Sequence, residues 1–342
     1  MEAGRRPNGD PDLFFRGFYA RNSEVGSKTL GMASLHLRTV CMNRNIWGAD
    51  RFEEISIRHS KFAVTRFAHE AAPALESFAS SSPAPFMAGI KAARERIVAR
   101  KDEDRETFRK LGSARFDVSF GGGAIMGAVG ESREFLFSEC GRQRTDPGPG
   151  LIGQIIREHG DEINDFDLGG LADGAFTGGL ETSASMLALG TVVLLGRPEL
   201  YAGMASDPTA VTPTVEELLR HLSVVQVAFP RFAKQDLVVG GHKIRKGSCV
   251  MVHLPAADRD PRTYPVGDGL DPSRATASHL AFGYGFHRCV GAELARMELR
   301  AAYPALARRF PDLTLDVPPD QLAYHAKSIV YGVESVPVRL HP

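Results

Sequence analysis

The sequence predicts a mainly α-helical protein with a small β-sheet, folded as a single domain. Isoleucines recur at helical spacing within 151–160, and an apolar segment over 165–195 is long enough for an extended helix. Residues 230–254 alternate around a Gly-Gly pair, which is typical of two strands joined by a turn. With 342 residues, the chain is long enough to bury one large core.

The first part of the chain is less regular than the rest. Residues 1–60 mix charges with scattered Gly and Asn and show weak periodicity. Helical patterns begin near Phe62 and return over 92–111, and breaker-rich stretches follow at 80–85 and 145–150. The sequence therefore divides into a divergent segment over 1–60 and a folded domain over 61–342.

Composition narrows the class of protein. Lys plus Arg and Asp plus Glu both number 41, so the net charge gives no argument for a nucleic-acid partner. No stretch of about 18 residues is apolar and free of charge, and the N-terminus lacks an apolar run of signal-peptide type. The four cysteines are widely spaced and form no CxxC pair. We expect a cytoplasmic protein with reduced cysteines and no membrane anchor.

The apolar segment 165–195 is predicted to form one long helix despite its glycines. Each glycine costs about 1 kcal/mol relative to alanine inside a helix. Either a large group packs against the bare backbone, or a neighbouring helix approaches closely. Both interpretations stay open for Gly169, Gly170, Gly174, Gly178 and Gly179.

A second helix is predicted to begin near residue 214. Thr214 and Glu217 fit a capping box, and Pro213 suits an early helical position. Glu217 and Arg220 lie three residues apart on one helix face. As a solvated surface pair they would contribute little to stability.

The most informative segment runs from Phe282 to Gly291. It places Cys289 after a glycine-rich loop and before an amphipathic helix. The glycines allow tight turns and the approach of a flat ligand, and a helix start lowers the pKa of a cysteine from about 8.5. A thiolate held this way suits a haem iron. A buried, inert cysteine is the alternative. A cysteine-phosphatase loop is excluded, because His287 lies two positions before the cysteine and Arg296 seven after it.

The same residues carry a resemblance to a known family. Phe-Gly-x-Gly-x-His-x-Cys-x-Gly followed by Leu-Ala-Arg-x-Glu resembles the haem-binding signature of the cytochrome P450 family, and every signature position is filled. The resemblance implies that Cys289 is the axial ligand of a haem b iron. It implies that Phe282 packs beside the sulfur, that His287 reaches a propionate, and that Gly283 and Gly291 shape the cofactor loop.

Two further segments extend the resemblance. Gly178-Gly-Leu-Glu-Thr is similar to the motif of the helix on the distal side of the haem, which gives Glu181 and Thr182 catalytic roles in delivering protons. Arg231 occupies a position that often faces a haem propionate in the family. A solvated arginine is the competing interpretation of Arg231.

The Glu-x-x-Arg spacing is also a family feature. The resemblance implies that Glu217 and Arg220 form a buried structural pair that braces the cysteine loop, because a buried charge needs a partner. A third arginine usually completes this pair, and Gly269 stands where we expect it. Arg274 or His279 could take its place.

The resemblance implies a P450 fold and a haem–thiolate monooxygenase. Such an enzyme hydroxylates or otherwise oxidises a hydrophobic small molecule with dioxygen, using electrons from a ferredoxin and its ferredoxin reductase. Arg288, Arg296 and Arg300 lie near the cysteine loop and are the expected docking residues.

The resemblance weakens toward the N-terminus. It is strongest over 150–342, looser within the rest of the haem domain at 61–342, and nearly absent over 1–60, so the N-terminal portion of the fold is expected to be incomplete. The sequence Trp47-Gly-Ala-Asp-Arg51 is a candidate for a haem-contacting helix. The alternative function is a haem-binding or degenerate P450-like protein without turnover.

Overall fold

The computed structural model describes residues 111–340, apart from 113, 120, 149, 228–230, 275–278, 286 and 326. Three of the predicted segments lie outside the described residues: the divergent segment over 1–60, the helical pattern near Phe62 and the candidate helix at Trp47–Arg51.

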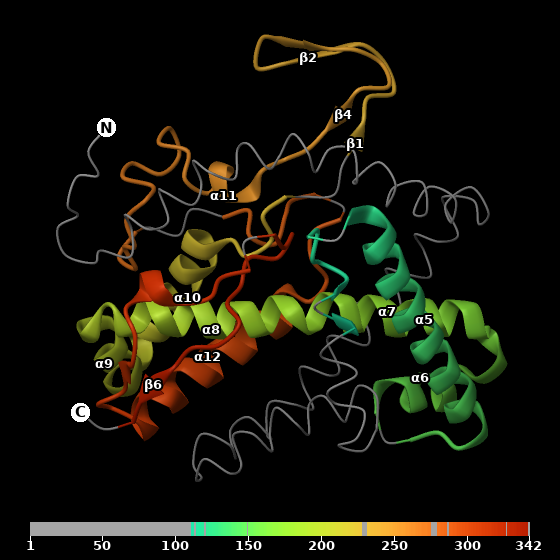
Figure 1. Cartoon of the computed structure of the whole chain (residues 1–342), viewed down its shortest axis with the longest axis horizontal. Helices are drawn as coiled ribbons and strands as arrows, with labels where there is room; N and C mark the ends of the chain where they lie inside the picture. The colour runs from blue at the N-terminus through green and yellow to red at the C-terminus, as the bar shows by residue number, and fades with distance from the viewer. Residues whose placement is uncertain are drawn as a thin grey trace.

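The described chain is mainly helical (Figure 1). The helices are α5 (Gly121–Thr145), α6 (Leu151–His159), η2 (Gly160–Glu162), α7 (Asp165–Gly179), α8 (Glu181–Leu195), α9 (Pro198–Ser206), α10 (Pro208–Leu222), α11 (Leu254–Ala257), α12 (Ala292–Arg309) and η3 (Pro319–Gln321). The strands are β1 (Arg231–Phe232), β2 (Leu237–Val239), β3 (His242–Ile244), β4 (Cys249–Val250), β5 (Thr314–Leu315) and β6 (Val338–Arg339).

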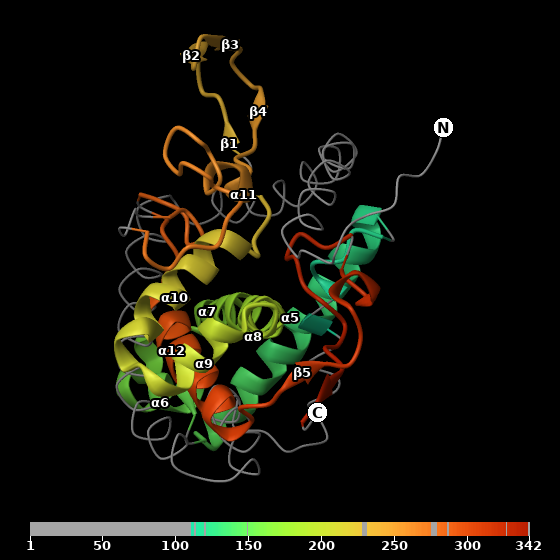
Figure 2. The same ribbon diagram turned by 90° about the vertical axis from the view of Figure 1, so that its left-hand side faces the viewer.

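Helices α7 and α8 lie along the middle of the molecule, and the other long helices surround them (Figure 2). The predicted single helix over 165–195 is interrupted at Leu180, which separates α7 from α8. The Asn164 side chain begins α7 by accepting a hydrogen bond of 2.9 Å from the N–H of Asp167. Within the described part of the chain, this segment alone is long and apolar enough to cross a membrane, judged by length and composition. Here it packs against α5, α9, α10 and α12.

Two hydrophobic clusters flank this central segment. The larger joins α8, α9, α10 and α12 with the C-terminal chain, and the smaller joins α5, α6 and α7. Helices α8 and α12 approach closely where Gly190 meets Tyr303, since a Cβ at Gly190 would lie 1.9 Å from the Tyr303 hydroxyl. That hydroxyl donates a hydrogen bond of 2.6 Å to the Met186 carbonyl. The contact fixes α12, and the cysteine loop ahead of it, relative to α8.

Helix α10 begins earlier than the sequence predicts. Its N-cap is Asp207, whose carboxylate accepts a hydrogen bond of 2.8 Å from the N–H of Thr209, with Pro208 at the first helical position. The predicted capping box at Thr214 is therefore wrong, because Thr214 lies inside the helix and its hydroxyl donates to the Ala210 carbonyl over 2.8 Å. Pro213 is accommodated within the helix.

The strands in the described part of the chain form antiparallel pairs, β1 with β4, β2 with β3, and β5 with β6. The turn joining β2 and β3 uses Gly240 and Gly241, whose φ angles of 56° and 81° favour glycine. This hairpin projects away from the helices (Figure 2). The predicted fold class, mainly α with little β-structure, is confirmed, although the β-structure consists of separate pairs.

Candidate functional site

The cysteine loop at 280–291 is a tight turn that leads into α12. Gly283 and Gly285 have φ angles of 69° and 80°, a region that residues with side chains rarely adopt. The N–H of Cys289 donates a hydrogen bond of 2.9 Å to the Phe282 carbonyl, which closes the loop. A Cβ built at either glycine would meet no described atom within 4 Å. The loop therefore presents bare backbone next to a fixed thiol.

The thiol of Cys289 lies just outside the helix. Gly291 is the N-cap of α12, so Cys289 precedes the first helical turn. The thiol is reached by solvent, yet partial burial raises its pKa above the usual range. The N–H of Gly291 and the charges of Arg288 and Arg296 oppose this shift only in part. The expected fall in pKa at the helix start is therefore wrong for the protein alone. A coordinated metal ion would supply the missing driving force for deprotonation.

Glu216 on α10 anchors the start of the cysteine loop. Its carboxylate lies 2.8 Å from Nε of Arg296, 3.1 Å from Nε2 of His279 and 3.2 Å from Arg300. The Arg296 guanidinium lies over the Phe282 ring at 4.7 Å. Burial alone would raise the pKa of Glu216, but hydrogen bonds from His279 and Arg296 hold it at about 2. An ionised Glu216 thus fixes both Phe282 and α12 relative to α10.

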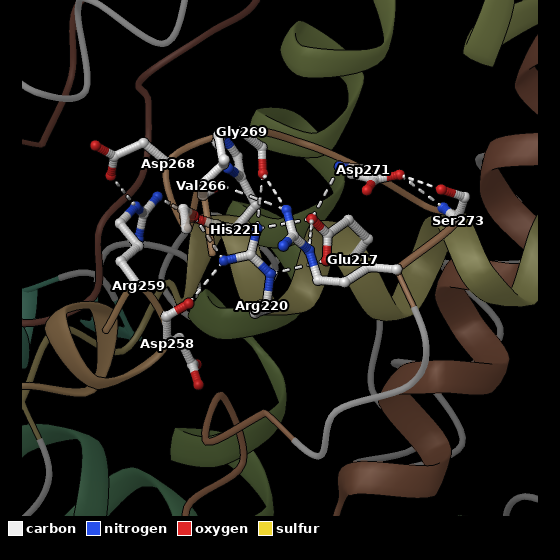
Figure 3. Close-up of polar contacts among 12 residues, drawn as sticks. Glu217, Arg220, His221, Asp258, Arg259, Val266, Asp268, Gly269, Asp271 and Ser273 are labelled. Carbon is white, nitrogen blue, oxygen red and sulfur yellow. Dashed lines mark hydrogen bonds and ion pairs between the residues drawn. The ribbon is translucent and has the colours of Figure 1, made fainter. Parts of the chain in front are cut away.

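Glu217 and Arg220 form a buried ion pair beside this anchor (Figure 3). Nε and Nη2 of Arg220 lie 2.8 and 2.7 Å from the two carboxylate oxygens of Glu217. The remaining N–H groups of Arg220 donate to the carbonyls of Asp258, Gly267 and Gly269 over 2.7, 2.8 and 2.9 Å. Because each charge is paired and hydrogen-bonded, burial is tolerated.

The third arginine of this network does not come from position 269, where it was expected. Gly269 contributes only its carbonyl, and Nε of Arg274 lies 3.4 Å from Oε1 of Glu217. The N–H of Asp271 donates to the same oxygen over 2.9 Å. His279, the other candidate, binds Glu216 instead. Arg274 is thus the residue that supports Glu217.

Asp258 is a site residue that sequence reasoning missed. Its buried carboxylate accepts a hydrogen bond of 2.7 Å from the Ser223 hydroxyl and one of 2.6 Å from the N–H of Leu280. Burial raises the pKa of this carboxyl. The residue joins the end of α10 to the first residue of the cysteine loop. Its partners lie 35 and 22 residues away, so no local pattern reveals them.

The interruption between α7 and α8 contains the second group of predicted residues. The hydroxyl of Thr182 donates a hydrogen bond of 2.5 Å to the Gly178 carbonyl across the break at Leu180. Glu181, the first residue of α8, is buried, whereas Thr182 is half-buried. The acid and the alcohol are therefore adjacent in the chain but differ in access to solvent.

The glycines of α7 fall into two groups, one that permits close helix packing and one that leaves the backbone open to a large group. A Cβ at Gly169 would lie 2.7 Å from the Phe137 ring, so this glycine permits close packing of α5 on α7. A Cβ at any of the others would meet no described atom within 4 Å; these are Gly170, Gly174, Gly178 and Gly179. The last two leave bare backbone open next to the break at Leu180.

A hydrogen bond connects the interrupted helix to the helix behind the cysteine loop. Oγ of Ser183 donates to Oε2 of Glu298 on α12 over 2.9 Å. Glu298 lies six residues after Ala292, or about 9 Å along the helix axis at about 1.5 Å per residue. The remaining predicted residues, Arg231 on β1 and His287 in the loop, are both exposed.

Comparisons with known proteins give this arrangement a family. The family model described as Cytochrome P450 matches residues 209–322, which include Glu217, Arg220 and Cys289. The chain is 38% identical over 250 residues to "Cytochrome P450 165C4" of Amycolatopsis orientalis, covering 73% of this chain and 61% of that protein. It superposes on the solved structure of Rif16 in complex with R-L with a TM-score of 0.70 and 32% identity, covering 85% of this chain and 81% of that one.

The chain belongs to the cytochrome P450 family. A second P450 structure, CYP105P1 in complex with filipin I, gives a TM-score of 0.75 at 30% identity, covering 84% of this chain and 76% of that one. The predicted P450 fold is thereby confirmed. The chain spans 61% of the length of P450 165C4 and 59% of the length of "Cytochrome P450 165B3", also from Amycolatopsis orientalis.

Members of this family bind haem b through a cysteine thiolate. The described residues of this P450 fit that group in three respects. The loop presents the sulfur of Cys289 beside backbone that carries no side chain at Gly283 and Gly285. The α7 glycines next to Thr182 leave a similar bare surface at the break between α7 and α8. Both surfaces suit a flat macrocycle, and a thiol is a suitable donor for iron.

Proposed function

We propose that this chain is a haem–thiolate monooxygenase that oxidises a hydrophobic small molecule with dioxygen. The observation that carries the proposal is the Cys289 loop, closed by the bond from the Cys289 N–H to Phe282 and left open at its left-handed glycines. When bound, haem supplies the redox-active iron at which dioxygen is reduced and one oxygen atom is transferred to substrate. Arg231 and His287 would hold the propionates, since an arginine fork matches a carboxylate well.

The proposed roles of Glu181 and Thr182 follow from their hydrogen bonding. Because the Thr182 O–H donates to Gly178, its oxygen is left to accept a hydrogen bond from a donor in the active site. The buried carboxylate of Glu181, one residue earlier, can exchange a proton with that donor. Proton transfer by a positioned group typically contributes about 10² to 10⁴ in rate.

The proposed electron donor is a separate ferredoxin with its reductase, in the cytoplasm. Of the three arginines expected to dock it, Arg288 and Arg300 keep about half and about a third of their side chains exposed. Arg296 is largely buried against Glu216 and Phe282, so we assign it to the loop rather than to docking. The filipin I bound to CYP105P1 supports a small-molecule substrate for this chain as well.

The absorption spectrum of the dithionite-reduced protein with carbon monoxide tests the cofactor assignment. We expect a strongly red-shifted band in wild type that is lost in Cys289→Ser. The matched control is Cys249→Ser, because Cys249 on β4 is also a free thiol and should leave the band unchanged. A band at the shorter wavelength of neutral-ligand haem, or no haem at all, would contradict the proposal and favour the degenerate P450-like alternative.

Turnover tests the distal and docking residues separately. Thr182→Ala should lower the product formed per dioxygen consumed, and unchanged coupling would remove Thr182 from the proton path. Arg288→Glu and Arg300→Glu should slow reduction by ferredoxin at low salt, since charges at a contact rim act mainly on encounter. Arg339→Glu on β6, also exposed, is the control. Equal reduction rates in all three variants would contradict the assigned docking face.

A further inference from the structure

The imidazole of His325 lies between two carboxylates that differ in exposure. Its Nδ1 is 3.5 Å from Oε1 of Glu181, and its Nε2 is 3.7 Å from Oε1 of Glu334. The Glu181 side chain is 9% exposed and that of Glu334 is 68% exposed. One ring nitrogen thus meets the buried acid next to Thr182, and the other meets a solvent-exposed carboxylate.

The position of the ring is set by the backbone around it. The N–H of His325 donates to the Gly332 carbonyl over 2.9 Å, and the N–H of Glu334 donates to the Ala323 carbonyl over 2.9 Å. A Cβ at Gly332 would lie 2.9 Å from Nδ1 of His325 and 2.6 Å from the Ser185 hydroxyl of α8. Only a glycine at this position lets the ring lie this close to α8.

The segment that carries His325 is itself anchored in the core. Tyr324 stacks on Tyr331 with ring centroids 5.7 Å apart, and Tyr331 is buried in the larger hydrophobic cluster. The N–H of Tyr331 donates to the Val224 carbonyl over 2.7 Å, next to the end of α10. The ring is therefore presented by a fixed support, which a positioning residue requires.

The charges that face His325 are negative. Glu181 approaches from α8, Glu334 from the same segment as the ring, and Asp117 from the chain that pairs with Ser328. The contact with Glu181 raises the pKa of the imidazole, burial opposes this, and Glu334 and Asp117 add to the increase. The ring consequently keeps its positive charge to a higher pH than a solvated histidine does.

We propose that His325 is a positioning residue that keeps the Glu181 carboxylate ionised and fixed next to Thr182. A carboxylate this deeply buried needs a positive partner, and the start of α8 supplies only a partial charge. The inference rests on the proposed monooxygenase function. It adds His325, which no local motif marks, to the residues that serve that function. Loss of the positive charge of His325 at alkaline pH would then limit proton delivery.

The first test needs no turnover. Histidine-ring NMR of the purified protein gives the pKa of His325, whose signal is identified by its absence in His325→Gln. We expect a higher pKa in wild type than in Glu181→Gln, because the carboxylate stabilises the charged ring. The control is His159 on α6, whose exposed partner is Glu162 at 3.6 Å and whose ring signal should be the same in both proteins. Equal pKa values of His325 in wild type and Glu181→Gln would overturn the inference.

The second test uses turnover. His325→Gln should lower kcat and coupling about tenfold with little change in KM, as expected for one lost charge-assisted contact. Wild-type coupling should fall as pH rises through the pKa of His325. His325→Lys should move this fall to higher pH, because an ordinary lysine keeps its charge to about pH 10. An unchanged pH profile in both variants would overturn the inference.

The two proposals fail in different ways. Loss of the red-shifted carbon monoxide band in wild type would reject the monooxygenase and, with it, the role of His325. An intact band with normal coupling in His325→Gln would reject the role of His325 alone. His159→Gln, on the surface of α6, should match wild type in every measurement.

Discussion

Replacing Glu216 with glutamine removes a charge on which two arginines and a histidine converge. Glutamine keeps the shape of the side chain and stands in for the protonated carboxyl. Arg296 and Arg300 on α12 and His279 before the cysteine loop would lose their shared anion. We therefore expect the change to weaken the attachment of α12 and the cysteine loop to α10.

The pKa of Glu216 gives the size of the effect. Its carboxyl has a pKa of about 2 in the folded protein, against an ordinary value of 4.5. Each tenfold change in an acid dissociation constant corresponds to about 1.4 kcal/mol, so the ionised form stabilises the fold by about 3 kcal/mol. Because the folded pKa is lowered, this contribution is complete above about pH 4.5 and is lost as pH falls from 4.5 toward 2.

Urea unfolding at pH 7, followed by circular dichroism, measures this loss. Glu216→Gln should lower the free energy of unfolding by about 3 kcal/mol, and the gap to wild type should narrow as pH falls below about 4.5. Glu293→Gln is the matched control, since Glu293 also binds Arg296 but is 70% exposed and should cost less than about 1 kcal/mol. Equal losses in the two variants, or a gap that stays constant down to about pH 3, would refute the reasoning.

Three further predictions concern α7 and its neighbours. Gly169→Ala should destabilise the protein by about 1 to 3 kcal/mol, because the added methyl group would push against Phe137. Gly170→Ala, with open space around it, should raise the free energy of unfolding by up to about 1 kcal/mol. Urea unfolding of both variants compares them. Asn164→Ala should cost about 1 kcal/mol in the same assay through loss of the α7 N-cap. Cys140, whose thiol pKa is raised to about 12 by burial, should resist alkylation of the native protein at about pH 8. Mass spectrometry of the digested protein measures this, and an alkylated Cys140 would contradict that burial.

Local sequence patterns predicted the residues that lie close together in the chain. The Cys289 loop, the Glu181–Thr182 pair and the Glu217–Arg220 pair each occupy a few consecutive positions. The spacing of Glu217 and Arg220 alone is equally consistent with a surface pair, and only the resemblance favoured burial. Their burial in the structure follows from carbonyls 38 to 49 residues away that no helical pattern contains.

Contacts between distant segments were not predictable. Glu216 directly precedes a recognised motif residue, yet its partners lie 63 to 84 residues further on. His325 and Glu181 are separated by most of the C-terminal half, and Gly332 brings them together only by lacking a side chain. The start of α10 was misplaced because Asp207-Pro208 and Thr212-Pro213 carry similar start signals, and the earlier one is used.

The expected pKa of Cys289 was wrong for an electrostatic reason. The sequence places the cysteine near a helix start, but the favourable field of a helix end falls off within one turn. Cys289 lies beyond the N-cap, where partial burial outweighs the nearby arginines. Sequence patterns rarely locate a helix end to within two residues.

The carbonyls gathered by Arg220 have a consequence for hydrogen exchange. The segment from Asp258 to Gly269 follows α11 without forming a helix or strand of its own, yet Arg220 binds it at three carbonyls and its guanidinium covers the buried ring of Tyr264 at 5.1 Å. A surface loop would normally exchange its amides by local opening. Here such opening would leave the buried guanidinium of Arg220 without its carbonyl acceptors. The loop and α10 should therefore open as one cooperative unit. The amide of Tyr264, which donates to the Asp260 carbonyl over 2.8 Å, should therefore exchange as slowly as the amides in the middle of α10.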